Sequence, residues 1–405
     1  MKQKMAGVLI AACFASSALR AQTTNSAGEP KAEHVVRARD LGIPFNGTPG
    51  PFDAITDVAG VEVGYTTLIE GSGKLEVGKG PVRTGVTAVF PRGRDNSDSV
   101  FAGTWDLNGN GEMTGIHWVT ESGFLDGPFM ITNTHSVGVV RDAVIEWQIR
   151  TKHQPVTDTY GPFFFSLPVV AETADVLLND MNGFHVTKAD AWHALDTAKP
   201  GPVAEGNLGG GTGMVCHGWK GGTGTASRVL PAKQGGYTVG VLVQANHGSP
   251  DRLTIAGVPV GETLKPHLDF SKWIPAGSGS IIILIATDAP LLPTQLNRLA
   301  KRAALGVGRV GGLGEDSSGD LFLAFSTGNP HASSTKPVAS LQMLSDGEIN
   351  LLFEAVVDAT EEAIVNTLIA AETMTGANDF TVAALPHDKL VEILKSHGRL
   401  VEAKP

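Results

Sequence analysis

The stretch Ala276-Gly277-Ser278-Gly279-Ser280 runs directly into Ile281-Ile282-Ile283-Leu284-Ile285, near the start of the last third of the chain. Five consecutive apolar residues after a glycine-rich turn predict a buried strand. Gly279 carries no side chain that could hinder attack of the Ser280 hydroxyl on the preceding carbonyl, and it tolerates the strained backbone that this attack requires. The pattern is typical of a self-cleaving N-terminal nucleophile, and it is equally compatible with a simple loop before a strand.

A cut between Gly279 and Ser280 would make Ser280 the first residue of a new chain. The freed α-amine would have a pKa of about 7.7–8, so part of it is available as a base near neutral pH. Such an amine can take the proton from the hydroxyl of the same residue. The sequence therefore offers a nucleophile and its base in one residue.

The first residues have the composition of an export signal. Lys2 and Lys4 form a basic start, residues 6–19 are apolar and small, and Leu19-Arg20-Ala21 can end a cleavage site before Gln22. The stretch is too short and interrupted for a membrane anchor. We expect residues 1–21 to be a signal peptide and the protein to be periplasmic. A lipid anchor on Cys13, in Ile10-Ala11-Ala12-Cys13, is the less favoured alternative because the apolar segment before it is very short.

Charge and cysteine content exclude several classes of protein. The formal net charge of -10 argues against binding to nucleic acid or to anionic membrane surfaces. Removal of the signal leaves Cys216 as a lone thiol, so no intrachain disulfide is expected and Cys216 is predicted to be buried. The 50 glycines suit a packed sheet protein with many turns.

Short apolar runs bounded by Gly and Pro alternate with segments of helical spacing. This alternation predicts a layered α/β protein in which sheets are sandwiched between helices. Residues 252–274 have mixed polarity and are expected to be an exposed linker. The expected strands are 61–65, 82–91, 129–134, 168–171, 239–244, 281–285 and 321–325, and the expected helices are 137–148, 291–305, 348–372 and 389–395.

No metal or organic cofactor is expected. Residues 106–112 begin like an EF-hand loop, but His117 stands at the twelfth position where a bidentate Glu is required, so a polar turn is the better interpretation. The histidines form neither a His-Glu-x-x-His helix nor a Cys/His cluster in the sequence. Residues 206–224 are rich in glycine but lack the Gly-Lys-Ser/Thr ending of a phosphate loop.

Four polar residues at predicted strand ends are candidates for chemistry. Glu172 ends an apolar strand, where a carboxylate needs a cation such as a substrate ammonium or an internal ion pair. Asn246 also ends a strand and could donate to an oxyanion, and Ser318 and Asp320 precede the 321–325 strand. Ser136, in the strand-to-helix turn Thr134-His135-Ser136-Val137-Gly138, is the runner-up nucleophile.

These residues lie within a longer resemblance. The chain is similar to the DmpA-type aminopeptidases, which comprise L-aminopeptidase/D-amino-acid esterases and β-peptidyl aminopeptidases. The resemblance extends from Arg37 to Gly376, nearly all of the mature chain. It is carried by ordered matches at residues 37–42, 47–51, 54–58, 211–216, 243–246, 286–291, 318–320 and 370–376.

The resemblance implies a role for each candidate. Ser280 matches the nucleophile, freed by autocleavage after Gly279, and Ser318 matches a serine that hydrogen-bonds it. Asp320 matches an acidic residue that orients this pair, Asn246 the oxyanion-hole amide, and Glu172 the carboxylate that holds the free amino group of the substrate. Some members carry a tyrosine two positions after this glutamate, where Ala174 stands here. This departure favours the β-peptidyl aminopeptidases within the family.

The resemblance also implies a fold and an assembly. We expect a four-layer αββα sandwich, resembling N-terminal-nucleophile (Ntn) hydrolases with different connectivity. Residues 22–279 and 280–405 would be the α and β chains of one autoprocessed catalytic domain, and αβ heterodimers would form a homo-oligomer. The expected substrates are peptides or amides with a free N-terminal amine.

Three alternatives remain open at this point. An L-aminopeptidase/D-amino-acid esterase of the same family is one. A self-cleaving N-acyltransferase resembling ornithine acetyltransferases is another, although those enzymes typically use Thr and act in the cytoplasm. The third is a periplasmic binding protein that keeps the pocket without the reaction.

Overall fold

The predicted strand after Ser280 lies in the middle of a six-stranded sheet. In this computed structural model, which describes residues 35–154, 164–266, 278–333 and 336–401, β11 (Ser278–Thr287) pairs antiparallel with β10 (Thr238–Asn246) and parallel with β12 (Ser317–Ser326). The sheet order is β4-β3-β12-β11-β10-β9. Its other members are β3 (Val100–Gly109), β4 (Phe124–Leu125) and β9 (Gly222–Val229).

A second sheet of four strands has the order β1-β2-β5-β6. Strands β1 and β2 are antiparallel, as are β2 and β5, whereas β5 and β6 are parallel. These strands are β1 (Glu62–Glu70), β2 (Val82–Phe90), β5 (Phe129–Asn133) and β6 (Val169–Thr173).

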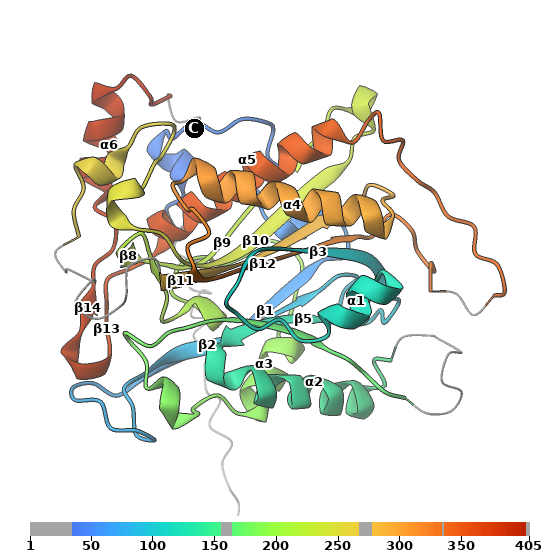
Figure 1. Cartoon of the computed structure of the whole chain (residues 1–405), viewed down its shortest axis with the longest axis horizontal. Helices are drawn as coiled ribbons and strands as arrows, with labels where there is room; N and C mark the ends of the chain where they lie inside the picture. The colour runs from blue at the N-terminus through green and yellow to red at the C-terminus, as the bar shows by residue number, and fades with distance from the viewer. Residues whose placement is uncertain (1–34, 155–163, 267–277, 334–335, 402–405) are drawn as a thin grey trace, which may run out of the picture. The chain divides into compact units, whose positions relative to one another are not determined.

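Helices cover the outer face of each sheet (Figure 1). On the four-stranded sheet lie α2 (Val137–Thr151) and α3 (Lys188–Asp196), and on the six-stranded sheet lie α4 (Pro293–Arg309) and α5 (Asn350–Ala370). The order of layers is therefore helix, sheet, sheet, helix. The expected αββα sandwich is confirmed.

Strand β11 contributes to two apolar cores, which explains its unbroken apolar sequence. Ile281, Ile283 and Ile285 pack toward α4 and α5, whereas Ile282 and Leu284 pack between the two sheets. Successive side chains of a strand point to opposite faces, so a strand buried on both faces must be apolar at every position. A third core, between the four-stranded sheet and its helices, includes Trp147.

Two strands of the large sheet were not predicted because glycines interrupt their pattern. A Cβ on Gly224 of β9 would lie 2.1 Å from the Ala363 carbonyl oxygen of α5. A Cβ on Gly103 of β3 would lie 2.4 Å from the Asn297 backbone nitrogen of α4. In both strands glycine permits a helix to lie directly on the sheet.

The prediction of an exposed linker at residues 252–274 is wrong for its described part, which ends at residue 266. Leu253, Ile255 and Val260 are fully buried and belong to the apolar core that also includes residues of α4 and α5. Their apolar side chains are separated by turns rather than arranged with one period, so the pattern of a regular element is missing.

The remaining elements are short: α1 (Ile116–Ser122), the β7–β8 hairpin (Val215–Cys216 and Trp219–Lys220), the β13–β14 pair (Met374–Thr375 and Thr381–Val382) and α6 (His387–Ser396). None of the helices in the described ranges is long and apolar enough to cross a lipid bilayer.

A buried ionic cluster joins the start of the described chain to the large sheet. The Arg39 guanidinium donates to both Glu362 carboxylate oxygens, at 2.5 and 2.7 Å, and Arg228 lies 2.7 Å from one of them. Arg37 donates to Glu205 at 2.6 Å. Burial alone would raise the pKa of Glu362, but Arg228 and Arg39 hold it below its usual value. The carboxylate is therefore ionised and compensated inside the protein.

Replacing Glu362 by Ala is expected to destabilise the fold strongly. It would leave two guanidinium groups without their partner, and breaking a buried pair on one side costs about 3–5 kcal/mol. Glu361→Ala is the matched control, because Glu361 pairs with the half-exposed Arg309 and such surface pairs contribute only about 0–1 kcal/mol. Chemical denaturation of both variants measures the difference. Equal losses in the two variants would contradict this account.

Candidate active site

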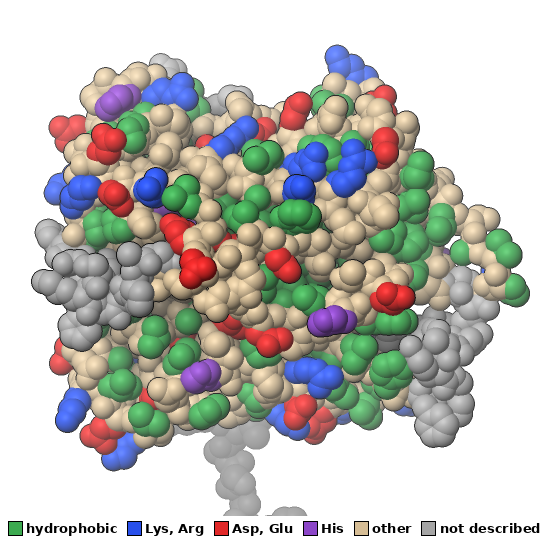
Figure 2. All heavy atoms as spheres, in the orientation of Figure 1, with side chains coloured by type: hydrophobic (Ala, Val, Ile, Leu, Met, Phe, Trp, Pro, Cys, Tyr) green, Lys and Arg blue, Asp and Glu red, His purple; other side chains and the backbone are tan. Residues whose placement is uncertain are grey.

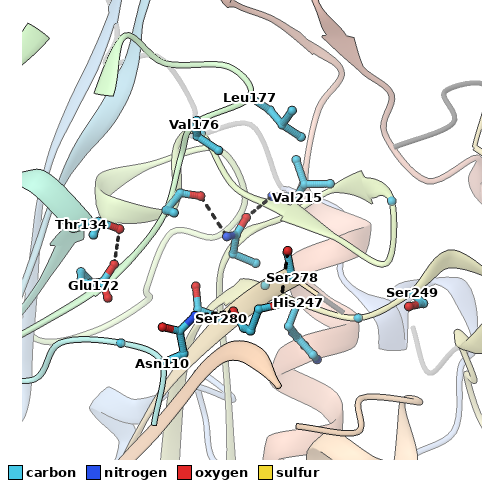
Figure 3. A pocket seen from close by; sticks show the side chains of 18 of the residues that line it. Asn110, Thr134, Glu172, Val176, Leu177, Val215, His247, Ser249, Ser278 and Ser280 are labelled. Atoms are coloured by element: carbon cyan, nitrogen blue, oxygen red, sulfur yellow. Dashed lines mark hydrogen bonds between the residues drawn. The ribbon is translucent and has the colours of Figure 1, made fainter. Parts of the chain in front are cut away.

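A cavity of about 690 Å³ opens where strand ends of the two sheets meet. Ser280 and Asn246 reach it from the six-stranded sheet, whereas Glu172 and Ala174 reach it from β6 and the residues that follow. Figure 3 shows Ser280 and Ser278 on one side, Glu172 and Thr134 on a second, and Val176, Leu177 and Val215 on a third. The fold thus brings these four predicted site residues, together with Gly279, into one cavity.

Ser280 is held between two neighbouring strands. Its Cα pairs with Asn246 of β10 on one side and with Gly319 of β12 on the other. The residue is only 5% exposed, and its hydroxyl makes no hydrogen bond to another described residue. A buried hydroxyl without a partner facing a cavity is available for chemistry.

The Gly279–Ser280 peptide bond lies inside β11, since this strand begins at Ser278, earlier than the sequence predicted. A Cβ on Gly279 would lie 2.9 Å from the His247 Cα and 3.0 Å from the Asn246 carbonyl oxygen. Glycine is therefore required here by the close approach of β10. The sheet fixes both the carbonyl before Ser280 and the hydroxyl after it.

Asn246 connects β10 to two chain segments around the cavity. Its Oδ1 accepts from the Val215 N–H at 2.8 Å, and its Nδ2 donates to the Ala174 carbonyl at 3.0 Å. These two partners fix which end of the amide carries the nitrogen. An amide nitrogen has two hydrogens, so one N–H of Asn246 remains for a further acceptor in the cavity.

Ser318 and Asp320 lie beside Ser280 without lining the cavity. The Ser318 hydroxyl donates to the Asp320 carboxylate at 2.7 Å, and Ser318 pairs with Gly279 in the parallel ladder. Burial raises the pKa of Asp320 to about 6, although Ser318 and the Ile281 backbone N–H favour its ionised form. An ionised Asp320 accepts the hydrogen bond that the Ser318 hydroxyl donates, and the serine oxygen remains free to accept another hydrogen bond.

Glu172 is a buried acidic side chain whose two carboxyl oxygens are both held by hydrogen bonds from neighbouring segments. One oxygen accepts from the Glu112 backbone N–H at 2.9 Å, and the other accepts from the Thr134 hydroxyl. Burial raises the pKa of Glu172, and these two donors oppose the shift. In the described part of the chain no Lys or Arg forms an ion pair with it. Glu172 can therefore form an ion pair with a positively charged group that enters the cavity.

The segment after β3 supports Glu172 from the six-stranded sheet. A Cβ on Gly111 would lie 3.2 Å from the Gly319 Cα and 3.3 Å from a Glu172 carboxylate oxygen, so glycine lets this segment pass between them. The Asn110 amide donates to the Ser317 carbonyl at 2.8 Å. Residues 106–109, predicted as part of a polar turn, instead form the end of β3. Because these residues are polar, the sequence did not predict that β3 extends to the cavity.

Ser136, the runner-up nucleophile, lies elsewhere. It is buried at the start of α2, and its backbone N–H donates to the Asn133 side chain at 3.0 Å. It does not line the cavity, whereas its neighbour Thr134 does. The expected strand-to-helix turn is present, but the residue that it places in the cavity is Thr134, which donates a hydrogen bond to Glu172. Sequence reasoning had missed Thr134, and its position directly after β5 was the available signal.

The structure also corrects the statement that the chain has no Cys/His cluster. Cys216, His217 and His247 come together behind the cavity, on three buried positions. Cys216 is buried and free, as predicted from its being the lone thiol.

Solved structures of related proteins share this architecture. One is the L-aminopeptidase D-Ala-esterase/amidase of Ochrobactrum anthropi, which is described as a prototype for the serine aminopeptidases and as a variant of the Ntn hydrolase fold. It is 46% identical to this chain with a TM-score of 0.83, and the match covers 90% of this chain and 99% of that one. A β-aminopeptidase of Burkholderia sp. is 47% identical with a TM-score of 0.80, covering 91% and 100%. The fold of this chain is that variant of the Ntn hydrolase fold.

The family follows from the sequence. The model of peptidase family S58 matches residues 53–382. The β-peptidyl aminopeptidase BapA of Sphingosinicella microcystinivorans is 54% identical over 385 residues, covering 91% of this chain and 94% of that protein. The chain belongs to peptidase family S58 and is a peptidase, which confirms the family resemblance.

Thr134→Val is expected to shift the pH dependence of peptide hydrolysis. The substitution keeps the shape of the side chain but removes a donor to the ionised form of Glu172, an interaction of about 1.5–3 kcal/mol. The pKa of Glu172, already raised by burial, should rise further, so the charge is lost at a higher pH as the pH falls. The acidic limb of kcat/KM should therefore move to higher pH. Thr134→Ser should keep the original profile, and an unchanged profile in the valine variant would refute the link.

Proposed function

We propose that this protein is an autoprocessed aminopeptidase that uses Ser280 as its N-terminal nucleophile and removes N-terminal residues, β-amino acids in particular, from peptides and amides. One observation carries the proposal. The uncompensated carboxylate of Glu172, the hydroxyl of Ser280 and the amide of Asn246 line the same cavity. An amine anchor, a nucleophile and an oxyanion donor in one cavity are what removal of a terminal residue requires.

Self-cleavage is the first step of the proposed sequence. The Ser280 oxygen attacks the Gly279 carbonyl carbon, the C–N bond between the two residues breaks, and the nitrogen leaves as the Ser280 α-amine. Water then hydrolyses the resulting ester, which releases the Gly279 carboxylate and restores the hydroxyl. Support comes from the position of this bond inside β11, where the sheet holds the reacting groups.

Turnover uses the same hydroxyl. The substrate ammonium pairs with Glu172, and the Ser280 oxygen attacks the first carbonyl while its own α-amine accepts the proton. The free N–H of Asn246 donates to the developing oxyanion. The amine then protonates the leaving nitrogen, and water hydrolyses the acyl-enzyme.

Ser318 and Asp320 are proposed to orient the Ser280 amine. Ser318 pairs with Gly279, so after a cut its hydroxyl would neighbour the new terminus. Asp320 accepts a hydrogen bond from the Ser318 hydroxyl, so the lone pairs of the serine oxygen remain to accept a hydrogen bond from an ammonium. No metal or organic cofactor takes part in this sequence.

The preference for β-amino acids rests on the room beside Ala174. An aromatic side chain at this position would narrow the cavity, whereas alanine leaves space for the additional backbone methylene of a β-amino acid. The two BapA proteins, 54% and 50% identical to this chain, are named as β-peptidyl aminopeptidases. The alternative within the family is an L-aminopeptidase with D-esterase activity, as the Ochrobactrum protein is described.

Export and assembly are further parts of the proposal. The predicted signal peptide, residues 1–21, lies outside the described residues. Its composition supports a periplasmic location, and the family resemblance supports a homo-oligomer of αβ heterodimers. Determination of the mature N-terminus and of the molar mass in solution tests both.

Ser280→Ala is expected to yield one uncut chain without amidase activity, because one hydroxyl serves both reactions. The unmodified protein should give two bands on a denaturing gel, of about 27 and about 13 kDa at the chain's mean of roughly 0.104 kDa per residue. Ser278→Ala is the matched control and should still be cut, since it changes a serine of the same strand. Two bands from Ser280→Ala would assign the nucleophile to another residue.

Glu172→Gln is expected to reduce kcat/KM for substrates with a free amine about ten- to a hundredfold, through loss of a charge-assisted contact of about 1.5–3 kcal/mol. Autocleavage should continue, since the precursor has no amine at that position. Glu112→Gln is the control, because Glu112 supports Glu172 through its backbone N–H. If the unmodified enzyme hydrolyses an N-acetylated substrate as fast as the same substrate with a free amine, Glu172 does not bind the amine.

Paired p-nitroanilides of a β-amino acid and the corresponding L-α-amino acid test the specificity. We expect the β substrate to be cleaved at least as fast. Ala174→Tyr should depress hydrolysis of the β substrate more than that of the α substrate, because it fills the added space. Rapid cleavage of the α substrate alone would overturn the β preference and leave the aminopeptidase activity in place.

A further inference from the structure

A second group of reactive side chains lies behind the wall of the cavity. Cys216 and His217 belong to the β7–β8 hairpin, and His247 follows β10. The two segments are joined by a hydrogen bond from the His217 N–H to the His247 carbonyl, at 2.8 Å. One potential ligand atom from each of the three residues lies within 4.8 Å of the other two. The hairpin therefore brings together residues about thirty positions apart in the sequence.

The imidazoles in this group have unused nitrogens. The His217 Nδ1 lies 2.9 Å from the Ser249 carbonyl oxygen, which only accepts hydrogen bonds, so Nδ1 carries the proton and Nε2 carries a lone pair. The Nε2 atom of His217 is buried without a hydrogen-bond partner among the described residues, and the Nδ1 atom of His247 lies 3.9 Å from the Cys216 Sγ. A buried nitrogen left without a partner is unfavourable. A metal ion bound by the His217 Nε2, the His247 Nδ1 and the Cys216 Sγ would supply that partner.

We propose that Cys216, His217 and His247 form a binding site for a single thiophilic metal ion of the zinc class. Two imidazoles and one thiolate are a ligand set that zinc accepts, with a water molecule as the fourth ligand. The proposal concerns binding only and does not depend on the proposed peptidase mechanism.

The spacing of the donors fits a tetrahedral ion. With Zn–N near 2.0–2.1 Å and Zn–S near 2.3 Å, neighbouring donors are about 3.4–3.6 Å apart. The Cys216 Sγ and the His247 Nδ1 are 3.9 Å apart, so a small side-chain rotation suffices. The Ser249 carbonyl also orients His217 in the way that metal-bound histidines are usually oriented by a second partner.

Zinc binding would release the proton of the Cys216 thiol, because the thiolate is the form that binds metal. The neighbouring positive group is Lys220, whose ammonium donates to the Met214 and Gly221 carbonyl oxygens at 2.9 and 2.8 Å.

The site has an entry path through the cavity. His247, Gly248 and Ser249 line the cavity wall. In Figure 3 the His247 ring points away from Ser280, toward the helix side of the sheet. The metal would therefore be held behind the catalytic face, one residue from Asn246.

Zinc binding to the purified protein, freed of metal with a chelator, tests the proposal. Titration against a chromophoric zinc chelator should show one Zn²⁺ per chain, with a Kd below about 1 μM. Cobalt(II) should give the d–d bands of a four-coordinate ion and a thiolate charge-transfer band. Absence of stoichiometric zinc binding, or of the thiolate band, overturns the assignment even if no variant folds.

Variants identify the ligands. Cys216→Ser and His217→Gln should each weaken zinc binding at least tenfold, and Cys216→Ser should abolish the charge-transfer band. His331→Gln is the control, because His331 is a surface residue of the same type. Zinc affinity that is unchanged in both cluster variants would place the ion elsewhere and refute the site.

Discussion

The pairing of β10 with β11 is the constraint on which the rest of the structure depends. This pairing places Asn246 opposite Ser280. Because β12 pairs with β11 on the other side, the backbone of Ser280 is fixed between two neighbouring strands. The four-stranded sheet then needs only to present the end of β6 across the inter-sheet core to place Glu172 on the same cavity. Because both sheets are covered by helices, strand ends are where polar groups can meet solvent and substrate without disturbing a core.

The sequence predicted the parts of the fold whose signal is local. The apolar run after Ser280 and the helical spacing of residues 291–305 and 348–372 correspond to β11, α4 and α5. Strands β3 and β9 could not be found in this way, because the glycines that break their pattern are required by helices from distant parts of the chain. Residues 252–266 were misjudged for a related reason, since their burial arises from a cap over the core rather than from a regular element.

The candidate site follows the same division. Ser280, Glu172 and Asn246 were predictable because each is a polar residue at the end of an apolar strand. The position of Thr134 directly after β5 was a local signal, but the contacts of Thr134 and of the Glu112 N–H with Glu172 depend on how three segments converge, which no local pattern encodes. The Cys216, His217 and His247 cluster was hidden for the same reason, because a two-residue hairpin turn and a strand end bring it together.

On the face seen in Figure 2, acidic and basic side chains are interspersed rather than gathered by sign.

The ionic cluster around Glu362 has a consequence for the physical state of a processed enzyme. Arg39 and Arg228 precede Gly279 in the chain, whereas their partner Glu362 follows it, and the β10–β11 ladder also joins the two sides. If the backbone is cut after Gly279 as proposed, these contacts become an interface between two polypeptides with the character of a protein core. Neither polypeptide can leave without exposing that core, so dissociation and unfolding become one event. The stability of the mature protein would then rise with its concentration, as in an obligate dimer, whereas that of the uncut precursor would not.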